Sequence, residues 1–214
     1  MNSSLSDSIY GMEGYDWQGK VIGGRIKSAP SDFVVIELDG DRKVDVITYE
    51  ESNSGLFLAG KVWKKQIDHG HMIKLIAKNF GVQEDDISTA GIKDAYAETT
   101  QLFSVYQPRK IPVDPFQPVL NLEISNYHYR REKVFPGSMG GNYFKIKITD
   151  CDIIDVSELD EFGRWARKGV LNYFGYQRFG SSRPITAQMG RLLLQKKYED
   201  AINLYLGAVS SASN

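Results

Sequence analysis

The chain has 214 residues, of which 42% are hydrophobic and 25% are charged, so it can form one large domain with a real core. No apolar run approaches the roughly 18 residues of a membrane span, and a single cysteine, Cys151, excludes an internal disulfide and a cysteine-based zinc cluster. The first residues lack the basic start and apolar stretch of a secretory signal, which predicts a cytoplasmic protein.

Strands dominate the first two thirds of the expected fold. From Gly24 the pattern predicts a short strand, a proline-containing turn and a second strand from Phe33 to Glu37. Alternating apolar residues and intervening turn residues predict further strands within 43–51, 55–65, 86–92, 101–107, 119–130 and 142–151.

Helices are expected at fewer places. Asp68 is a suitable N-cap, Gly81 a suitable stop, and the residues between them share one apolar face (Met72, Ile73, Ile76, Ala77 and Phe80). Further helices are expected at 157–169, with Ser157 near the cap and Gly169 near the end, and then at 186–196 and 198–206. Strands in succession with few helices predict an α+β domain around a largely antiparallel mixed sheet flanked by helices.

The net charge of −1 conceals an uneven distribution. Residues 1–60 hold ten acidic and five basic residues, whereas 162–197 hold eight basic and no acidic residues, interleaved with aromatic ones. Basic and aromatic side chains together suit a surface that contacts phosphates and stacks bases. A basic helix pair that faces acidic parts of the same fold is an equally open interpretation.

Several other kinds of site lack support. His69 and His71 beside Asp68 have no further ligand motif, so capping or surface histidines are favoured over a metal site. A phosphate-binding loop, a dinucleotide fingerprint and a nucleophilic serine elbow are absent from the sequence. The glycine-rich stretch 137–142 precedes a strand and indicates a tight turn. No metal or other cofactor is therefore expected.

Two stretches remain, "AGIKDAYAETTQ" at 90–101 and "NYFGYQRFG" at 172–180. On its residues alone, Asp94 is either the cap of a following turn or a carboxylate presented for chemistry. The first stretch resembles the A-G-x-K-D-x-x-A-x-T-x-Q signature of the TruD family of tRNA pseudouridine synthases, and the second resembles that family's N-Y-F-G-x-Q-R-F-G motif. "GGRIKSAPSDFVVIE" and "GNYFKIKI" are similar to two more family segments, so the resemblance extends from about Ile22 to Gly207.

The resemblance implies a pseudouridine-synthase-like catalytic domain over residues 1–180, incomplete, followed at 181–214 by the helical beginning of the family's inserted domain. It implies an RNA pseudouridine synthase, an isomerase that converts uridine in tRNA to pseudouridine without a cofactor. Uridine thirteen of tRNA is the expected target.

The family pattern also assigns roles to residues. Asp94 matches the catalytic aspartate, which would attack the anomeric carbon of the ribose or remove a ribose proton, and both routes stay open. Lys27 matches its basic partner and Asn172 a hydrogen-bonding residue that orients it. The implied substrate-binding residues are Phe174, which would stack on the uracil, Phe33, Lys93 and Arg178. Core packing for the two phenylalanines and a plain surface charge for Lys27 are the structural alternatives.

The match departs from the family at two places. His69 stands where many relatives have threonine, and the part of the catalytic domain that follows the inserted domain has no counterpart in these 214 residues. Two other hypotheses therefore stay open beside the enzyme. One is a non-catalytic RNA-binding remnant that uses residues 162–197. The other is one part of a split enzyme or oligomer, in which a second chain completes the catalytic sheet.

Overall fold

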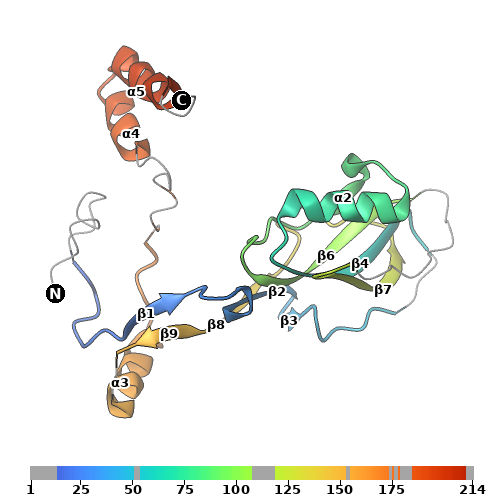
Figure 1. The fold of residues 1–214 in the computed structure, drawn as a ribbon, viewed down its shortest axis with the longest axis horizontal. Coiled ribbons are helices and arrows are strands. Elements are labelled where there is room, and N and C mark those ends of the chain that lie inside the picture. Colours follow the sequence, from blue (N-terminus) through green and yellow to red (C-terminus); the bar gives the residue numbers. More distant parts are fainter. Residues whose placement is uncertain are drawn as a thin grey trace. The chain divides into compact units, whose positions relative to one another are not determined.

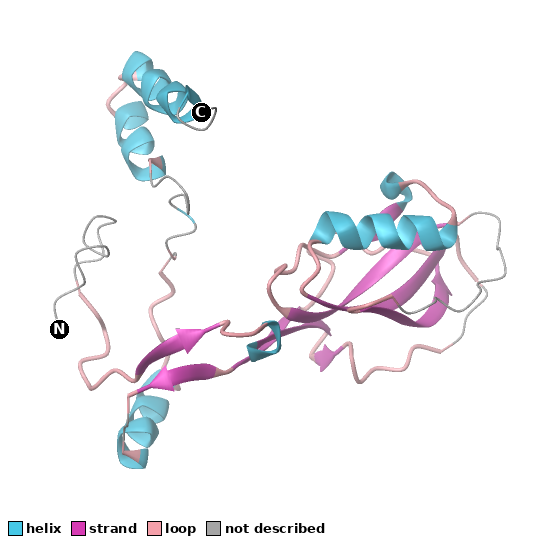
Figure 2. Cartoon of the chain, viewed as in Figure 1, coloured by secondary structure: helices cyan, strands magenta, loops and turns pink. Residues whose placement is uncertain are grey.

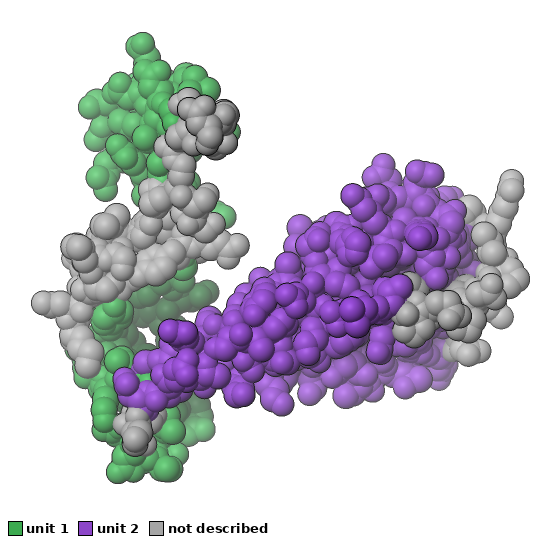
Figure 3. Space-filling model, in the orientation of Figure 1, with its two compact units in different colours: residues 1–22, 153–214 green, residues 23–152 purple. Residues whose placement is uncertain are grey.

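The computed structural model describes residues 14–50, 54–107, 119–152, 155–173, 175, 178 and 185–210. Contacts divide the chain into a larger unit, Gly23–Asp152, and a second unit formed by 1–22 and 153–214 (Figure 3). The two units do not meet at residue 180, where the resemblance places a domain boundary. That boundary separates the family's catalytic and inserted domains, and it stays a prediction. Within the described ranges, no helix combines the length and apolar character needed to cross a bilayer.

A seven-stranded sheet forms the larger unit, with the order β3-β2-β6-β4-β7, while β5 pairs with β6 and β8 with β2 (Figure 1). The strands β1 and β9 pair as a separate two-stranded ribbon. The bounds are β1 (Gly23–Ile26), β2 (Phe33–Asp39), β3 (Arg42–Lys43), β4 (Phe57–Lys65), β5 (Ile87–Thr89), β6 (Glu98–Tyr106), β7 (Leu122–Arg130), β8 (Gly141–Ile146) and β9 (Ile148–Cys151). Of the described strand pairs, β2–β6 is parallel and the rest are antiparallel, which confirms the expected α+β fold.

The helix α2 (His69–Phe80) covers one face of this sheet, as the cyan helix over magenta strands in Figure 2 shows. Its expected ends are confirmed. The Asp68 carboxylate accepts a hydrogen bond from the His71 amide at 2.9 Å, and Gly81 has the left-handed φ of 63°. The buried face of α2 packs on the strands with a common core (Met72, Ile76, Ala77, Val62, Phe103, Val105, Leu122 and Ile124). Each fully buried large apolar side chain there contributes about 1.5–3 kcal/mol. This core fixes the strands that carry the candidate site.

Two sequence predictions are corrected. The strand expected over 43–51 is short, because the chain turns after Lys43 and the Val46 amide donates back to the Lys43 carbonyl oxygen. The strand expected over 142–151 is divided at Lys147, so that β8 pairs with β2 and β9 with β1. Short 3-10 turns, Pro30–Asp32 and Glu84–Asp86, precede β2 and β5.

The second unit contains α3 (Val156–Ala166), α4 (Thr186–Leu194) and α5 (Tyr198–Ser210). The α3 cap is Asp155, whose carboxylate accepts from the Ser157 amide, so Ser157 lies near the cap as expected. Trp17 packs against α3, with its ring centroid 5.3 Å from those of Phe162 and Trp165. Among the described residues of this unit, only Ala201 belongs to a buried core.

Candidate active site

The segment between β5 and β6, residues 90–97, presents Asp94 at the surface of the larger unit. It contains bends but no helix or strand. The Asp94 side chain is 48% exposed, and its Oδ2 atom lies 3.3 Å from Nζ of Lys27. The ammonium group and the carboxylate attract each other at this distance. The structure thus brings together the two residues for which the resemblance implied an acid and its basic partner.

Lys27 has an unusual backbone conformation for a lysine, with φ at 60°. Left-handed backbone at a non-glycine residue costs about 1 kcal/mol or more, and such residues are frequent at functional sites. Its Nζ lies 4.1 Å from the ring centroid of Phe33, a cation–π contact. Phe33 therefore packs in the core and orients Lys27, and its contact with a substrate base stays a prediction.

An open recess of about 640 Å³ lies beside Lys27. It is lined by Arg25, Ile26, Lys27, Ser28, Thr149 and Asp150. The Tyr96 hydroxyl donates to the Ser28 carbonyl oxygen at 3.3 Å, and Oγ of Ser28 lies 2.6 Å from Oγ1 of Thr149. These contacts join the Asp94 segment to the Lys27 segment and to β9. The sequence did not single out Tyr96 or Thr149, because a lone tyrosine or threonine carries no signal of its own.

Lys93, the neighbour of Asp94, points into the protein. Its side chain is 9% exposed and its Nζ lies 2.7 Å from Oε1 of Glu37, which is 1% exposed. The other Glu37 oxygen accepts from the Leu102 amide at 2.8 Å. A buried ammonium group engaged with a carboxylate has no access to an RNA phosphate. The structure therefore contradicts the RNA contact predicted for Lys93, and a structural role replaces it.

Lys64 on β4 is a buried lysine that the sequence predictions did not include. It is fully buried, and its Nζ donates to the carbonyl oxygens of Ile67 at 2.7 Å, Asp94 at 2.8 Å and Lys93 at 3.4 Å. Burial lowers the pKa of Lys64 to about 8, against an attraction from Asp94 that favours the charged form. The sequence could have indicated this burial, because Lys64 lies two positions after Val62 in β4 and alternate residues of a strand face the same side.

The second motif lies in the other unit. Asn172 and Arg178 are exposed, while Phe174 lies outside the described residues. Their roles beside Asp94 stay predictions. Six described basic residues of 162–197 are exposed and form no ion pair within the described part of the chain (Arg164, Arg167, Lys168, Arg191, Lys196 and Lys197). A surface open to an anionic partner and pairing with acidic parts of the same fold both stay predictions for this segment.

The histidines at the start of α2 form no metal site in the structure. Among residues described here, no three or more His, Cys, Asp or Glu side chains gather in a way that could hold a metal ion. Burial, and then the charges of Lys64 and Lys93, lower the pKa of His69. The His71 amide takes part in the α2 cap.

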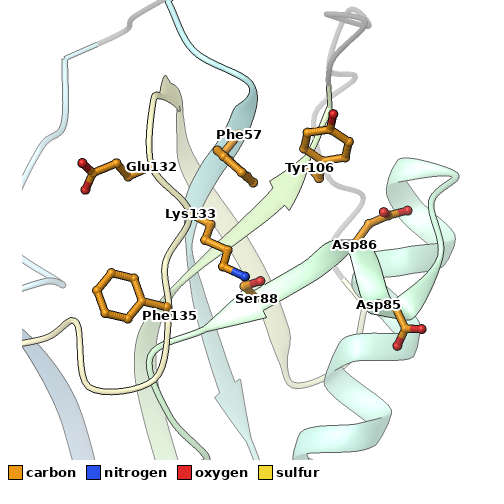
Figure 4. Close-up of a pocket in the computed structure, with 8 residues that line it drawn as sticks. All are labelled: Phe57, Asp85, Asp86, Ser88, Tyr106, Glu132, Lys133 and Phe135. Atoms are coloured by element: carbon orange, nitrogen blue, oxygen red, sulfur yellow. The ribbon is translucent and has the colours of Figure 1, made fainter.

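A different recess, of about 550 Å³, lies against β4, β5 and β6 and is shown in Figure 4. Its lining combines carboxylates, aromatic rings and one lysine (Phe57, Asp85, Asp86, Ser88, Tyr106, Glu132, Lys133 and Phe135). None of the predicted site residues lines it. The recess beside Lys27 is therefore the one associated with the candidate site.

Known proteins match nearly the whole of this chain. The family model described as tRNA pseudouridine synthase D (TruD) matches residues 9–214. A probable tRNA pseudouridine synthase D from Archaeoglobus fulgidus is 32% identical over 204 residues, covering 95% of this chain and 47% of that protein. One from Thermococcus gammatolerans is 38% identical over 188 residues, covering 87% of this chain and 43% of that protein.

A solved structure, described as a putative tRNA pseudouridine synthase D (TruD) from Methanosarcina mazei, superimposes with a TM-score of 0.80 at 26% identity. The match covers 96% of this chain and 46% of that one. The chain therefore spans a little under half the length of the relatives it matches. Its sheet and the segment that carries Asp94 belong to a fold shared with them.

Proposed function

Because the chain belongs to the TruD family of tRNA pseudouridine synthases, we propose that it isomerises uridine in tRNA to pseudouridine. Uridine thirteen is the proposed target, as the resemblance implies. The observation that carries the proposal is the partly exposed Asp94 carboxylate held 3.3 Å from the Lys27 ammonium group, beside an open recess. Such a substrate agrees with the cytoplasmic location expected from the sequence.

The reaction breaks the bond between N1 of uracil and C1′ of ribose and forms a bond between C5 and C1′. C5 loses its proton to solvent and N1 gains one, so no oxidant or reductant is consumed. An ionised Asp94 either attacks C1′ and is displaced later, or removes a ribose proton to give a glycal. Lys27 would orient Asp94 in either route.

The target uridine must leave its base stack to reach Asp94, at a cost of a few kcal/mol. Exposed basic residues of 162–197 would offset this cost by binding phosphates, and Phe174 would stack on the extruded base. Trp165 and Phe162 are less suited to base stacking, because Trp17 packs against them. Asn172 and Arg178 are proposed to act from the second unit on the same substrate.

We also propose that residues 1–180 belong to the family's catalytic domain and that 181–214 open its inserted domain. The described helices α4 and α5 suit this second assignment. A split enzyme, in which a second chain completes the catalytic sheet, stays an alternative proposal.

The test is tritium release from tRNA that carries 5-tritiated uridine, because only C5 exchanges its hydrogen in this reaction. The variant Asp94→Asn should reduce release at least roughly a thousandfold and keep tRNA affinity, since it removes the carboxylate that reacts. Asp85→Asn is the matched control, because Asp85 is an exposed aspartate in the other recess and should retain wild-type release.

Tritium release that survives Asp94→Asn would contradict the catalytic role proposed for Asp94. Binding without release by every variant would favour the RNA-binding remnant. Release that appears only after a second chain is added would favour the split enzyme.

A further inference from the structure

The backbone of residues 91–94 is held by side chains of neighbouring strands. The Gly91 carbonyl oxygen accepts from Oγ1 of Thr89 at 3.3 Å and from Nε2 of Gln101 at 3.4 Å. The carbonyl oxygens of Lys93 and Asp94 accept from Lys64. This segment has no strand or helix of its own, so these contacts help to determine where the Asp94 backbone lies.

Lys64 makes the shortest of these contacts, and it also donates to the Ile67 carbonyl oxygen at 2.7 Å. One amine therefore joins the segment before α2 to the segment that carries Asp94. An ammonium group has three N–H donors, which matches the three carbonyl oxygens that surround it. A lysine elsewhere on a strand would reach solvent, but this one is fully buried.

The burial of this charge is unfavourable in itself. Lys64 forms no ion pair with a carboxylate among the described residues, and an apolar side chain of the same length would fill the space without that cost. The amine donates hydrogen bonds to three carbonyl oxygens and is attracted to the nearby Asp94 charge. An apolar side chain would provide neither interaction.

Resting on the proposed function, we infer that Lys64 is the positioning residue for Asp94: its buried ammonium group fixes the Asp94 backbone while Lys27 orients the carboxylate. Asp94 needs this support because its own side chain is 48% exposed and is not enclosed by packing. A displacement of about 1 Å at a reacting group can reduce a rate about a hundredfold. Lys64 thus affects turnover without touching the substrate.

The experiment is amide hydrogen exchange on the full chain without RNA, with Lys64→Met and a matched control, Lys65→Met. Lys65 is the next residue of β4, and its Nζ lies 3.9 Å from Oε2 of Glu98, whereas Lys64 contacts the carbonyl oxygens of Lys93 and Asp94. Lys64→Met should speed exchange in 91–97 at least about tenfold while α2 exchanges as in wild type. Lys65→Met should leave both unchanged. Unchanged exchange in 91–97, or an equal increase throughout the chain, would overturn the inference.

A second measurement needs no variant and covers the case in which Lys64→Met fails to fold. In a wild-type NMR titration, loss of the Lys64 proton should shift the Asp94 and Ala95 amide resonances with the same midpoint as the Lys64 13Cε resonance. Amides that do not respond at that midpoint would overturn the inference.

Turnover adds a readout that a merely structural role would not change. Lys64→Met should lower kcat about ten- to a hundredfold with KM unchanged, whereas Lys65→Met should match wild type. An equal kcat for wild type and Lys64→Met would overturn the inference. If wild type shows no turnover, the proposed function fails, while the exchange and NMR results still decide the role of Lys64 in placing Asp94.

Discussion

The two units of this chain hold their functional residues in different ways. In residues 23–152, Asp94 and Lys27 lie on segments attached to strands that carry a buried core. In the second unit, Asn172 and Arg178 are exposed, and Ala201 is the one described residue that is buried. The acid and its basic partner are thus placed by the larger unit itself, whereas the described residues of the second motif are exposed.

The comparison is most strongly tested by removing one phenylalanine from each unit. Phe103 is fully buried beneath α2, so Phe103→Ala should lower the free energy of unfolding by about 3–5 kcal/mol. Phe162 is 44% exposed and makes ring contacts with Trp17 and Trp165, so Phe162→Ala should cost less, about 1–3 kcal/mol. Urea unfolding of both variants measures the difference. Equal losses would show that the second unit is as firmly packed as the first.

The next largest effect concerns the ion pair at the site. Lys27→Met should reduce turnover about a hundred- to a thousandfold, because the charge beside Asp94 is lost. It should change the free energy of unfolding by less than about 1 kcal/mol, since the pair is partly exposed. Lys147→Met is the control, because it removes another surface pair, with Asp32 at 3.8 Å. Turnover equal to that of the control would contradict the role of Lys27.

The pH dependence of the free energy of unfolding tests the burial of Lys64, the buried residue next to the candidate site. Burial lowers the pKa of Lys64 to about 8 in the folded chain, below its ordinary value of 10.5. The unfolded chain therefore binds more protons between these values, and stability rises with pH in that window. The free energy of unfolding of wild type minus that of Lys64→Met should increase by on the order of 3 kcal/mol from below pH 8 to above pH 10.5. Denaturant curves at each pH measure it, and a flat difference would contradict the burial of the charge.

The smallest predicted effect lies in the second unit. Trp17→Ala removes two ring contacts with α3, each worth about 0.5–1.5 kcal/mol. Exchange should become faster in α3 and stay unchanged in α2, because the two helices belong to different units. Faster exchange in both helices would show that the units unfold together. Unchanged exchange in both helices would show that Trp17 does not stabilise α3.

The sequence predicted best where local chemistry decides the outcome. The cap at Asp68, the stop at Gly81 and the apolar face between them are local features, and the structure has them. The strand predicted over 43–51 was wrong because alternation alone does not reveal a turn: Val44 is buried while Val46 is exposed.

In the candidate site, too, the sequence predicted some residues correctly and missed those that depend on distant contacts. The motifs identified Asp94 and Lys27, which the structure brings together, although 67 positions separate them in the chain. The motifs did not distinguish the directions of the neighbours Lys93 and Asp94 well enough to exclude an RNA contact for Lys93. That required Glu37, a buried partner 56 positions earlier. Lys64 was missed because a lysine at an inward-facing position of β4 interrupts the alternation of apolar and polar residues from which the strand was predicted.

The buried Glu37 also has a consequence for how the chain folds. Its carboxylate on β2 meets the Leu102 amide on β6 across the parallel pair, 65 residues away in sequence, so this contact requires the closure of a long loop. A slip of one residue would turn Glu37 to the opposite face and remove both of its partners. The correct alignment is thus the one that leaves no unpaired buried carboxylate. We expect β2 to join the sheet late and in a single register, and the Asp94 segment to become ordered in that same step.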